Sequence, residues 1–149
     1  MLQPSVERVL IDMGFINRYR EISDKFSIKD ESFKYEKSDV VNLLQELGVE
    51  VSVYEGGQYF ANFEFVGNYQ FRLGLTIKYN IIEVDLTVKN ENLSIKSGGS
   101  LGLLVQLITD WRDSVKKPSF GNSEQLKSLL AEVVALYTDI KEEITGVRT

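Results

Sequence analysis

Apolar residues recur at every second position through most of the segment from Val49 to Lys96, and this alternation predicts antiparallel β-strands. Turn residues at four places divide the segment into five runs. Paired positions across each turn must have a constant sum, and one apolar face is kept throughout when the turns lie at 55–57, 66–68, 80–81 and 90–91. The sequence therefore predicts a five-stranded antiparallel meander.

The two faces of this meander differ in composition. The face expected in the core takes the odd positions from Val49 to Tyr79, the even positions from Ile82 to Val88, then Leu93 and Ile95. We call the opposite side the open face, and it carries Ser52, Tyr54, Phe60, Asn62, Glu64, Gln70, Arg72, Gly74, Thr76, Lys78, Glu83, Asp85, Thr87 and Lys89. The predicted registers set Lys78 opposite Glu83 and Arg72 beside Asn62.

Apolar residues with a period near 3.6 predict helices before and after the meander in the chain, over 5–13, 38–47, 101–111 and 123–144. Ser38 is the expected N-cap of the second helix. The segment 15–37 reads as helix up to Lys25 and as irregular chain or short strand afterwards. The fold class is therefore α+β: a single domain over 1–149, with a five-stranded antiparallel β-meander and α-helices from both chain ends packed on one face.

Composition narrows the chemistry. The chain of 149 residues contains neither cysteine nor histidine, which excludes disulfides, Ser–His–Asp triads and Cys–His pairs. It also disfavours zinc, copper, haem and iron–sulfur sites, so no cofactor is expected. The absence of cysteine agrees with a reducing compartment. Because no basic, apolar leader and no apolar run of about 18 residues is present, we expect a cytoplasmic protein without a membrane partner.

The net charge of −5 disfavours nucleic acid, which attracts basic surfaces. On the open face, Phe60 has Gly74 across from it and Tyr54 nearby, a combination typical of a binding hot spot. It is equally typical of an aromatic ring that covers a strand glycine for structural reasons. The polar positions around them fit either a docking surface or a solvated face with ion pairs that contribute about 0.2–1 kcal/mol each.

Three further features have both a possible functional role and a simpler structural one. Glu64, Glu83 and Asp85 are possible acid–base groups or Mg²⁺ ligands, but they are out of register and mixed with cations, which favours ion pairing. The segment 96–102 resembles an anion-binding nest, although a strand-to-helix turn needs the same residues. The stripe over 126–144 fits packing on the sheet or a short coiled-coil seam, so a monomer and a homodimer both stay open.

These patterns favour a non-enzymatic protein-binding domain whose partner is another protein, with a basic one favoured by the negative charge. In size, acidity and lack of histidine and cysteine, the chain resembles compact bacterial inhibitor or immunity-type proteins. The alternative is a small-molecule or phosphate-ligand domain that uses the Gly98-Gly99 turn or a pocket between sheet and helices. A hydrolase that uses only carboxylates or tyrosine ranks last. The expected binding residues are Tyr54, Phe60, Glu64, Arg72, Gly74, Lys78, Glu83 and Asp85.

Overall fold

An antiparallel sheet forms the centre of the fold. The computed structural model describes residues 2–28, 30–90 and 96–147. The strands are β1 (Val51–Tyr54), β2 (Gln58–Ala61), β3 (Glu64–Val66), β4 (Tyr69–Lys78), β5 (Ile81–Asn90) and β6 (Lys96–Ser100). Their order is β1-β2-β4-β5-β6, and β3 pairs with β4 beyond the end of β2. The α+β prediction with an antiparallel meander is confirmed, with six strands because the second predicted run divides into β2 and β3.

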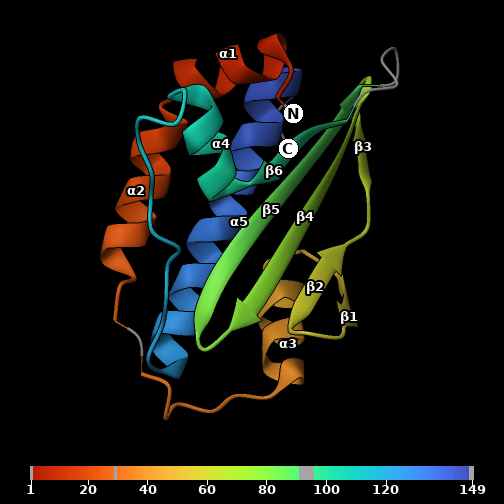
Figure 1. The fold of residues 1–149 in the computed structure, drawn as a ribbon. Coiled ribbons are helices and arrows are strands. Elements are labelled where there is room, and N and C mark those ends of the chain that lie inside the picture. The colour runs from red at the N-terminus through yellow and green to blue at the C-terminus, as the bar shows by residue number, and fades with distance from the viewer. Residues whose placement is uncertain (1, 29, 91–95, 148–149) are drawn as a thin grey trace.

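Helices precede and follow the sheet along the chain. Those in the described residues are α1 (Pro4–Asp12), α2 (Phe15–Lys25), α3 (Lys37–Glu46), α4 (Leu101–Ile108) and α5 (Ser123–Thr145). Figure 1 shows α3 and α5 behind the sheet, while the side of the sheet nearer the viewer carries no helix. The helices α1 and α2 lie against α5. The sheet thus has one covered and one open face.

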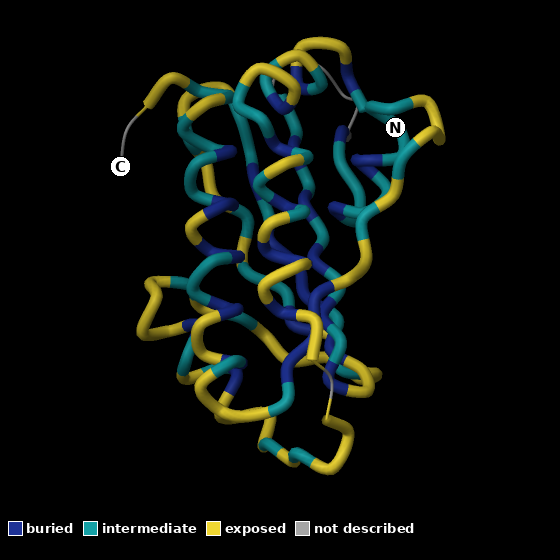
Figure 2. Tube along the Cα trace, turned by 90° about the vertical axis from the view of Figure 1, so that its left-hand side faces the viewer, coloured by how far each residue is buried: buried dark blue, intermediate teal, exposed yellow. Residues whose placement is uncertain are grey.

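The core follows the apolar stripes predicted for the strands and helices. Leu73 and Leu75 of β4 and Val84 and Leu86 of β5 are each at most 2% exposed. They belong to one cluster with the buried stripe of α5, which comprises Leu126, Leu129, Leu130, Val133, Val134, Leu136, Tyr137 and Ile140. Figure 2 shows buried and exposed positions alternating along the helices, as expected when one side of each helix faces a core.

Two predicted helix boundaries are corrected. Glu36 rather than Ser38 is the N-cap of α3, and its backbone N–H donates to Asp39 Oδ2 at 2.8 Å. The helix α4 ends at Ile108 and not at Trp111. Thr109 Oγ1 donates to the carbonyl oxygen of Val105, and Asp110 and Trp111 adopt φ values of 54° and 64°, which no α-helix continues.

The turn between β4 and β5 lies one residue earlier than predicted. Tyr79 and Asn80 form it with φ values of 54° and 60°, as in a type I′ turn, so Ile77 pairs with Ile82 and Lys78 with Ile81. The Asn80 amide holds this turn by donating to the carbonyl oxygens of Asp30 and Phe33 at 2.7 and 3.1 Å. The register differs from the prediction by two positions, which keeps the predicted faces but leaves Tyr79 75% exposed.

The last strand is also displaced from its predicted place. Residues 97–100 were expected as a strand-to-helix turn, but they belong to β6 and pair with β5 from Asp85 to Val88. A Cβ atom at Gly98 would lie 2.0 Å from the carbonyl oxygen of Leu86, so the glycine permits close approach of two strands. The predicted pairs of Leu93 and Ile95 lie outside the described residues.

Candidate functional site

A β-bulge between β2 and β3 determines what reaches the open face. Phe60 pairs with Gly74 and Glu64 pairs with Phe71, so residues 61–63 oppose only residues 72–73 of β4. The extra residue reverses the side to which the side chains of β3 point, relative to the predicted register. Beyond the bulge, β3 continues through a two-residue loop to β4, in which Val66 pairs with Tyr69.

The bulge assembles an aromatic cluster around one arginine on the open face. The Arg72 guanidinium carbon lies 4.7 Å from the ring centroid of Phe60 and 4.8 Å from that of Phe63. Tyr54 meets Phe60 edge-on, with centroids 5.5 Å apart and the planes at 70°. We call Tyr54, Phe60, Phe63 and Arg72 the arginine cluster. Each cation–π contact of this kind is worth about 0.5–1 kcal/mol at an exposed site, so the cluster holds the Arg72 side chain in place.

Phe60 has the structural role that the sequence allowed, since its ring lies on Gly74. A Cβ atom at position 74 would lie 2.7 Å from Phe60 Cε1 and 2.8 Å from Cδ1. The glycine is buried although it is on the open face, because the ring covers it. This packing fixes the Phe60 ring, and it does not conflict with a binding role for the exposed side of the cluster.

Two aromatic side chains of the open face are exposed, and one of them belongs to the arginine cluster. Tyr54 is 52% exposed, and Phe65, which pairs with Gln70 on the open face, is 67% exposed. Phe63 and Phe65 were predicted in the core, and this prediction is wrong because the bulge turns them outward. Tyrosine and arginine are among the side chains that most often dominate the free energy of protein–protein binding.

The acidic residues of the open face are each near a cation. Asp85 pairs with Gly74 on one side and with Ser100 on the other. Its burial, followed by the nearby charge of Glu83, raises the pKa of the Asp85 carboxyl, while Lys117 and Arg72 oppose the rise. Glu83 Oε2 accepts from Lys117 Nζ at 2.7 Å, so its partner is Lys117 and not the predicted Lys78.

Glu64 lies on the covered side of the sheet, contrary to prediction. Its Oε2 accepts from Tyr137 Oη at 2.9 Å and from Lys141 Nζ at 2.6 Å, and both donors belong to α5. Burial, with a smaller effect of Glu64, raises the pKa of the Tyr137 hydroxyl far above its ordinary value. These three residues line a cleft of about 390 Å³ between α3, α5 and the sheet, which also has Leu47 and Glu50 in its walls.

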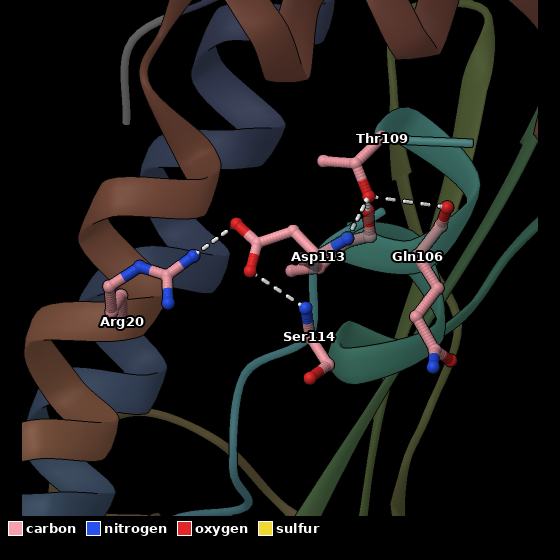
Figure 3. Close-up of polar contacts among 6 residues, drawn as sticks. Arg20, Gln106, Thr109, Asp113 and Ser114 are labelled. Atoms are coloured by element: carbon pink, nitrogen blue, oxygen red, sulfur yellow. Dashed lines mark hydrogen bonds and ion pairs between the residues drawn. The ribbon is translucent and has the colours of Figure 1, made fainter. Parts of the chain in front are cut away.

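The first half of β5, which β6 does not reach, is covered by another segment of the chain. The segment from Thr109 to Asn122 runs between α2 and β5, and Ile82 N donates to the carbonyl oxygen of Pro118 at 2.9 Å. Figure 3 shows how this segment begins: Arg20 of α2 reaches Asp113, whose backbone N–H donates to Thr109 Oγ1 at 3.1 Å. The contacts fix α2, the segment and β5 together.

The remaining predicted features give less support to ligand chemistry. The described residues contain no group of three acidic side chains placed to hold a metal ion. The Gly98-Gly99 segment pairs with β5 as a strand, and Ser100 Oγ accepts from Leu103 N as the N-cap of α4. The free Gly98-Gly99 turn, one of the two sites predicted for a phosphate ligand, is therefore absent.

Comparison with known proteins adds no functional information. No protein-family model, no curated protein and no solved structure matches the chain. Among the helices of the described residues, none has both the length and the apolar character required to cross a membrane.

The structure brings together half of the predicted binding residues. Tyr54, Phe60, Arg72 and Gly74 form one contiguous group, and Asp85 adjoins Gly74. Lys78 and Glu83 lie toward the β4–β5 turn, and Glu64 belongs to the other face. The predicted three-residue loop at 66–68 is wrong, because Gly67 and Asn68 form a two-residue loop. This dipeptide was the one signal in the sequence for the two aromatic residues that prediction missed, since a two-residue loop here puts Phe65 on the face of Gln70.

Proposed function

We propose that the protein is a non-enzymatic protein-binding domain of the cytoplasm that acts by occupying a partner's surface, as an inhibitor or immunity-type protein does. The observation that carries the proposal is the arginine cluster, in which Arg72 is held between two phenyl rings on a face free of helices. A preordered arginine loses less side-chain entropy on binding than a free one. The net charge of −5 favours a basic partner through electrostatic steering.

The proposal is tested with two variants on the open face and one matched control. Phe60→Asp and Arg72→Glu place negative charge in the cluster, and Lys127→Glu makes the same charge change as Arg72→Glu at an exposed position of α5. The wild-type chain is used to capture partners from the source cells, and the partner is purified for calorimetry. We expect both open-face variants to fold as the wild type does, by circular dichroism.

The affinities of the three variants for the captured partner show whether the open face is the binding surface. Loss of a central hot spot costs at least about 2 kcal/mol, which corresponds to a roughly thirtyfold weaker Kd. Arg72→Glu and Phe60→Asp should each weaken binding by that much, while Lys127→Glu should not. If all three variants bind the captured protein as the wild type does, the open face is not the binding surface.

The cleft beside Glu64, Tyr137 and Lys141 supports a second candidate, a small-molecule domain. Its volume of about 390 Å³ lies in the range of ligand sites, and two hydrogen-bond donors meet at its wall. An anionic ligand here would have to displace Glu64 from Lys141. A thermal-shift screen of anionic metabolites tests this candidate. A stabilising hit should disappear in Lys141→Met, and a screen without hits counts against the cleft.

A further inference from the structure

The strand β1 ends the sheet, and its outer side is unpaired. It is the first strand in the order β1-β2-β4-β5-β6, and Figure 1 shows it at the outer limit of the sheet. Among the described residues, the backbone of β1 forms ladder hydrogen bonds with β2 alone. Ser52, Val53 and Tyr54 are all exposed. Such an edge presents free N–H and C=O groups that can pair with another extended chain.

The two ends of the strand order differ in what lies beside them. At the far end, β6 pairs only with residues 85–89 of β5. Before that stretch, Ile81 bridges to Ser119 and the carbonyl oxygen of Pro118 accepts from Ile82 N, so the chain's own segment covers the first half of β5. At β1 there is neither a covering segment in the described residues nor a proline or lysine within the strand, which are the usual protections of an edge. The β1 edge is therefore available to a partner.

The net negative charge of the protein lies in the part of the chain that contains this edge strand. Residues 36–64 contain six acidic side chains and one basic one, a net charge of −5, whereas the rest of the chain contains 16 of each. Glu50 immediately precedes β1 and Glu55 immediately follows it, and both are exposed. Glu50 and Glu55 are five positions apart, which in extended chain separates their Cα atoms by about 17 Å. A basic strand laid along β1 would thus find a carboxylate at each end.

The same two glutamates oppose pairing between two copies of this chain. In an antiparallel two-fold pairing centred between Ser52 and Val53, Glu50 of one copy would lie opposite Glu55 of the other. Like charges directly opposite in a sheet are destabilising. The edge thus disfavours a second copy and favours a chain of opposite charge.

We propose that the outer edge of β1 binds an extended segment of a partner protein as an additional strand, with Glu50 and Glu55 accepting lysine or arginine side chains of that segment. This inference rests on the proposed function in naming how the partner is held. Tyr54 connects the two surfaces, because it belongs both to β1 and to the arginine cluster. Backbone pairing supplies affinity in this mode of recognition, and the end charges supply selectivity.

The probe is a fluorescein-labelled peptide with the core Lys-Val-Thr-Val-Thr-Lys, whose two lysines match the spacing of Glu50 and Glu55. Fluorescence anisotropy with the full-length protein should show saturable binding at about 0.15 M salt. N-methylation of both valines removes backbone donors without removing charge, and it should weaken binding at least about tenfold. The double variant Glu50→Lys and Glu55→Lys should also bind the lysine peptide at least about tenfold more weakly than the wild type does. It should bind a peptide in which glutamate replaces both lysines.

A matched double variant, Glu21→Lys and Glu143→Lys, makes the same charge change at exposed positions of α2 and α5, and it should bind as the wild type does. Equal binding of the methylated and unmethylated peptides would show charge attraction alone and overturn the inference. Absence of binding would do the same. Sedimentation provides a third contradicting outcome: the wild type is a dimer and the Glu50→Lys and Glu55→Lys double variant is a monomer. A second copy of the chain would then occupy the edge.

The Arg72→Glu variant separates this inference from the proposed function. The guanidinium lies on the open face and not on the β1 edge, so Arg72→Glu should keep the peptide affinity of the wild type. If the peptide binds as expected while the captured partner ignores both open-face variants, the edge stands and the open-face proposal fails. If partner capture depends on Arg72 and the peptide does not bind, the reverse holds.

Discussion

The contact between Phe60 and Gly74 allows a sharp prediction about stability. In Gly74→Ala, the new Cβ atom would overlap the Phe60 ring at 2.7–2.8 Å, so the ring must move off β4. It would then lose its place over Arg72, worth about 0.5–1 kcal/mol, and its edge-on contact with Tyr54, worth about 0.5–1.5 kcal/mol. Alanine recovers about 0.5–1 kcal/mol relative to glycine within a strand. We expect Gly74→Ala to lower the free energy of unfolding by about 1 kcal/mol.

The sign of this effect should reverse when the ring is absent. In a Phe60→Ala background nothing overlaps the new methyl group, and Gly74→Ala should then stabilise the fold by about 0.5–1 kcal/mol. Urea unfolding followed by far-UV circular dichroism measures all four corners of this cycle, and 1 kcal/mol corresponds to a midpoint shift of roughly 0.5 M. Gly102→Ala is the control, because its Cβ would meet only the Val115 carbonyl at 3.8 Å. Equal effects of Gly74→Ala in both backgrounds would refute the packing argument.

Three further predictions concern other parts of the fold. Gly98→Ala should cost about 3 kcal/mol or more in urea unfolding, since its Cβ would lie 2.0 Å from the Leu86 carbonyl oxygen; a cost below that of an ordinary surface substitution would contradict the β5–β6 pairing. Burial, then Glu83 and Asp85, raises the pKa of Tyr19 from 10.0 to about 12, so its contribution to stability is complete below pH 10 and is lost as the pH rises toward 12. Tyr19→Phe should remove an alkaline loss of about 2–3 kcal/mol, and unchanged stability curves at pH 8 and 11.5 would argue against the burial. Asp85 has a raised pKa, so its contribution to stability is complete below its unfolded pKa and is lost as the pH rises through the folded one. Asp85→Asn should therefore raise Tm at pH 7 and leave Tm near the wild-type value below the unfolded pKa of aspartate, whereas a lower Tm at pH 7 would mean that Arg72 and Lys117 outweigh the burial.

Most of the architecture follows from local patterns in the sequence. The alternation along β4 and β5 identifies the buried residues from Phe71 to Ile77 and from Ile82 to Val88, because each strand has only two faces and one is apolar. The long stripe of α5 and its end at Gly146 follow from the helical period and from the left-handed cap. These features depend on neighbours within a few positions, so they can be read without knowledge of the fold.

The candidate site depends on contacts that local patterns do not contain. The bulge before β3 moves Phe63 and Phe65 outward and Glu64 inward, and alternation alone favours the register without it. The turn at Tyr79 and Asn80 is fixed by bonds from Asn80 to a segment about fifty residues earlier. The sequence by itself thus determined an antiparallel sheet with one apolar face. Only the tertiary structure decided which aromatic residues surround Arg72 and which segment covers the first half of β5, because a one-residue bulge and long-range hydrogen bonds leave the hydrophobic period unchanged nearly everywhere else.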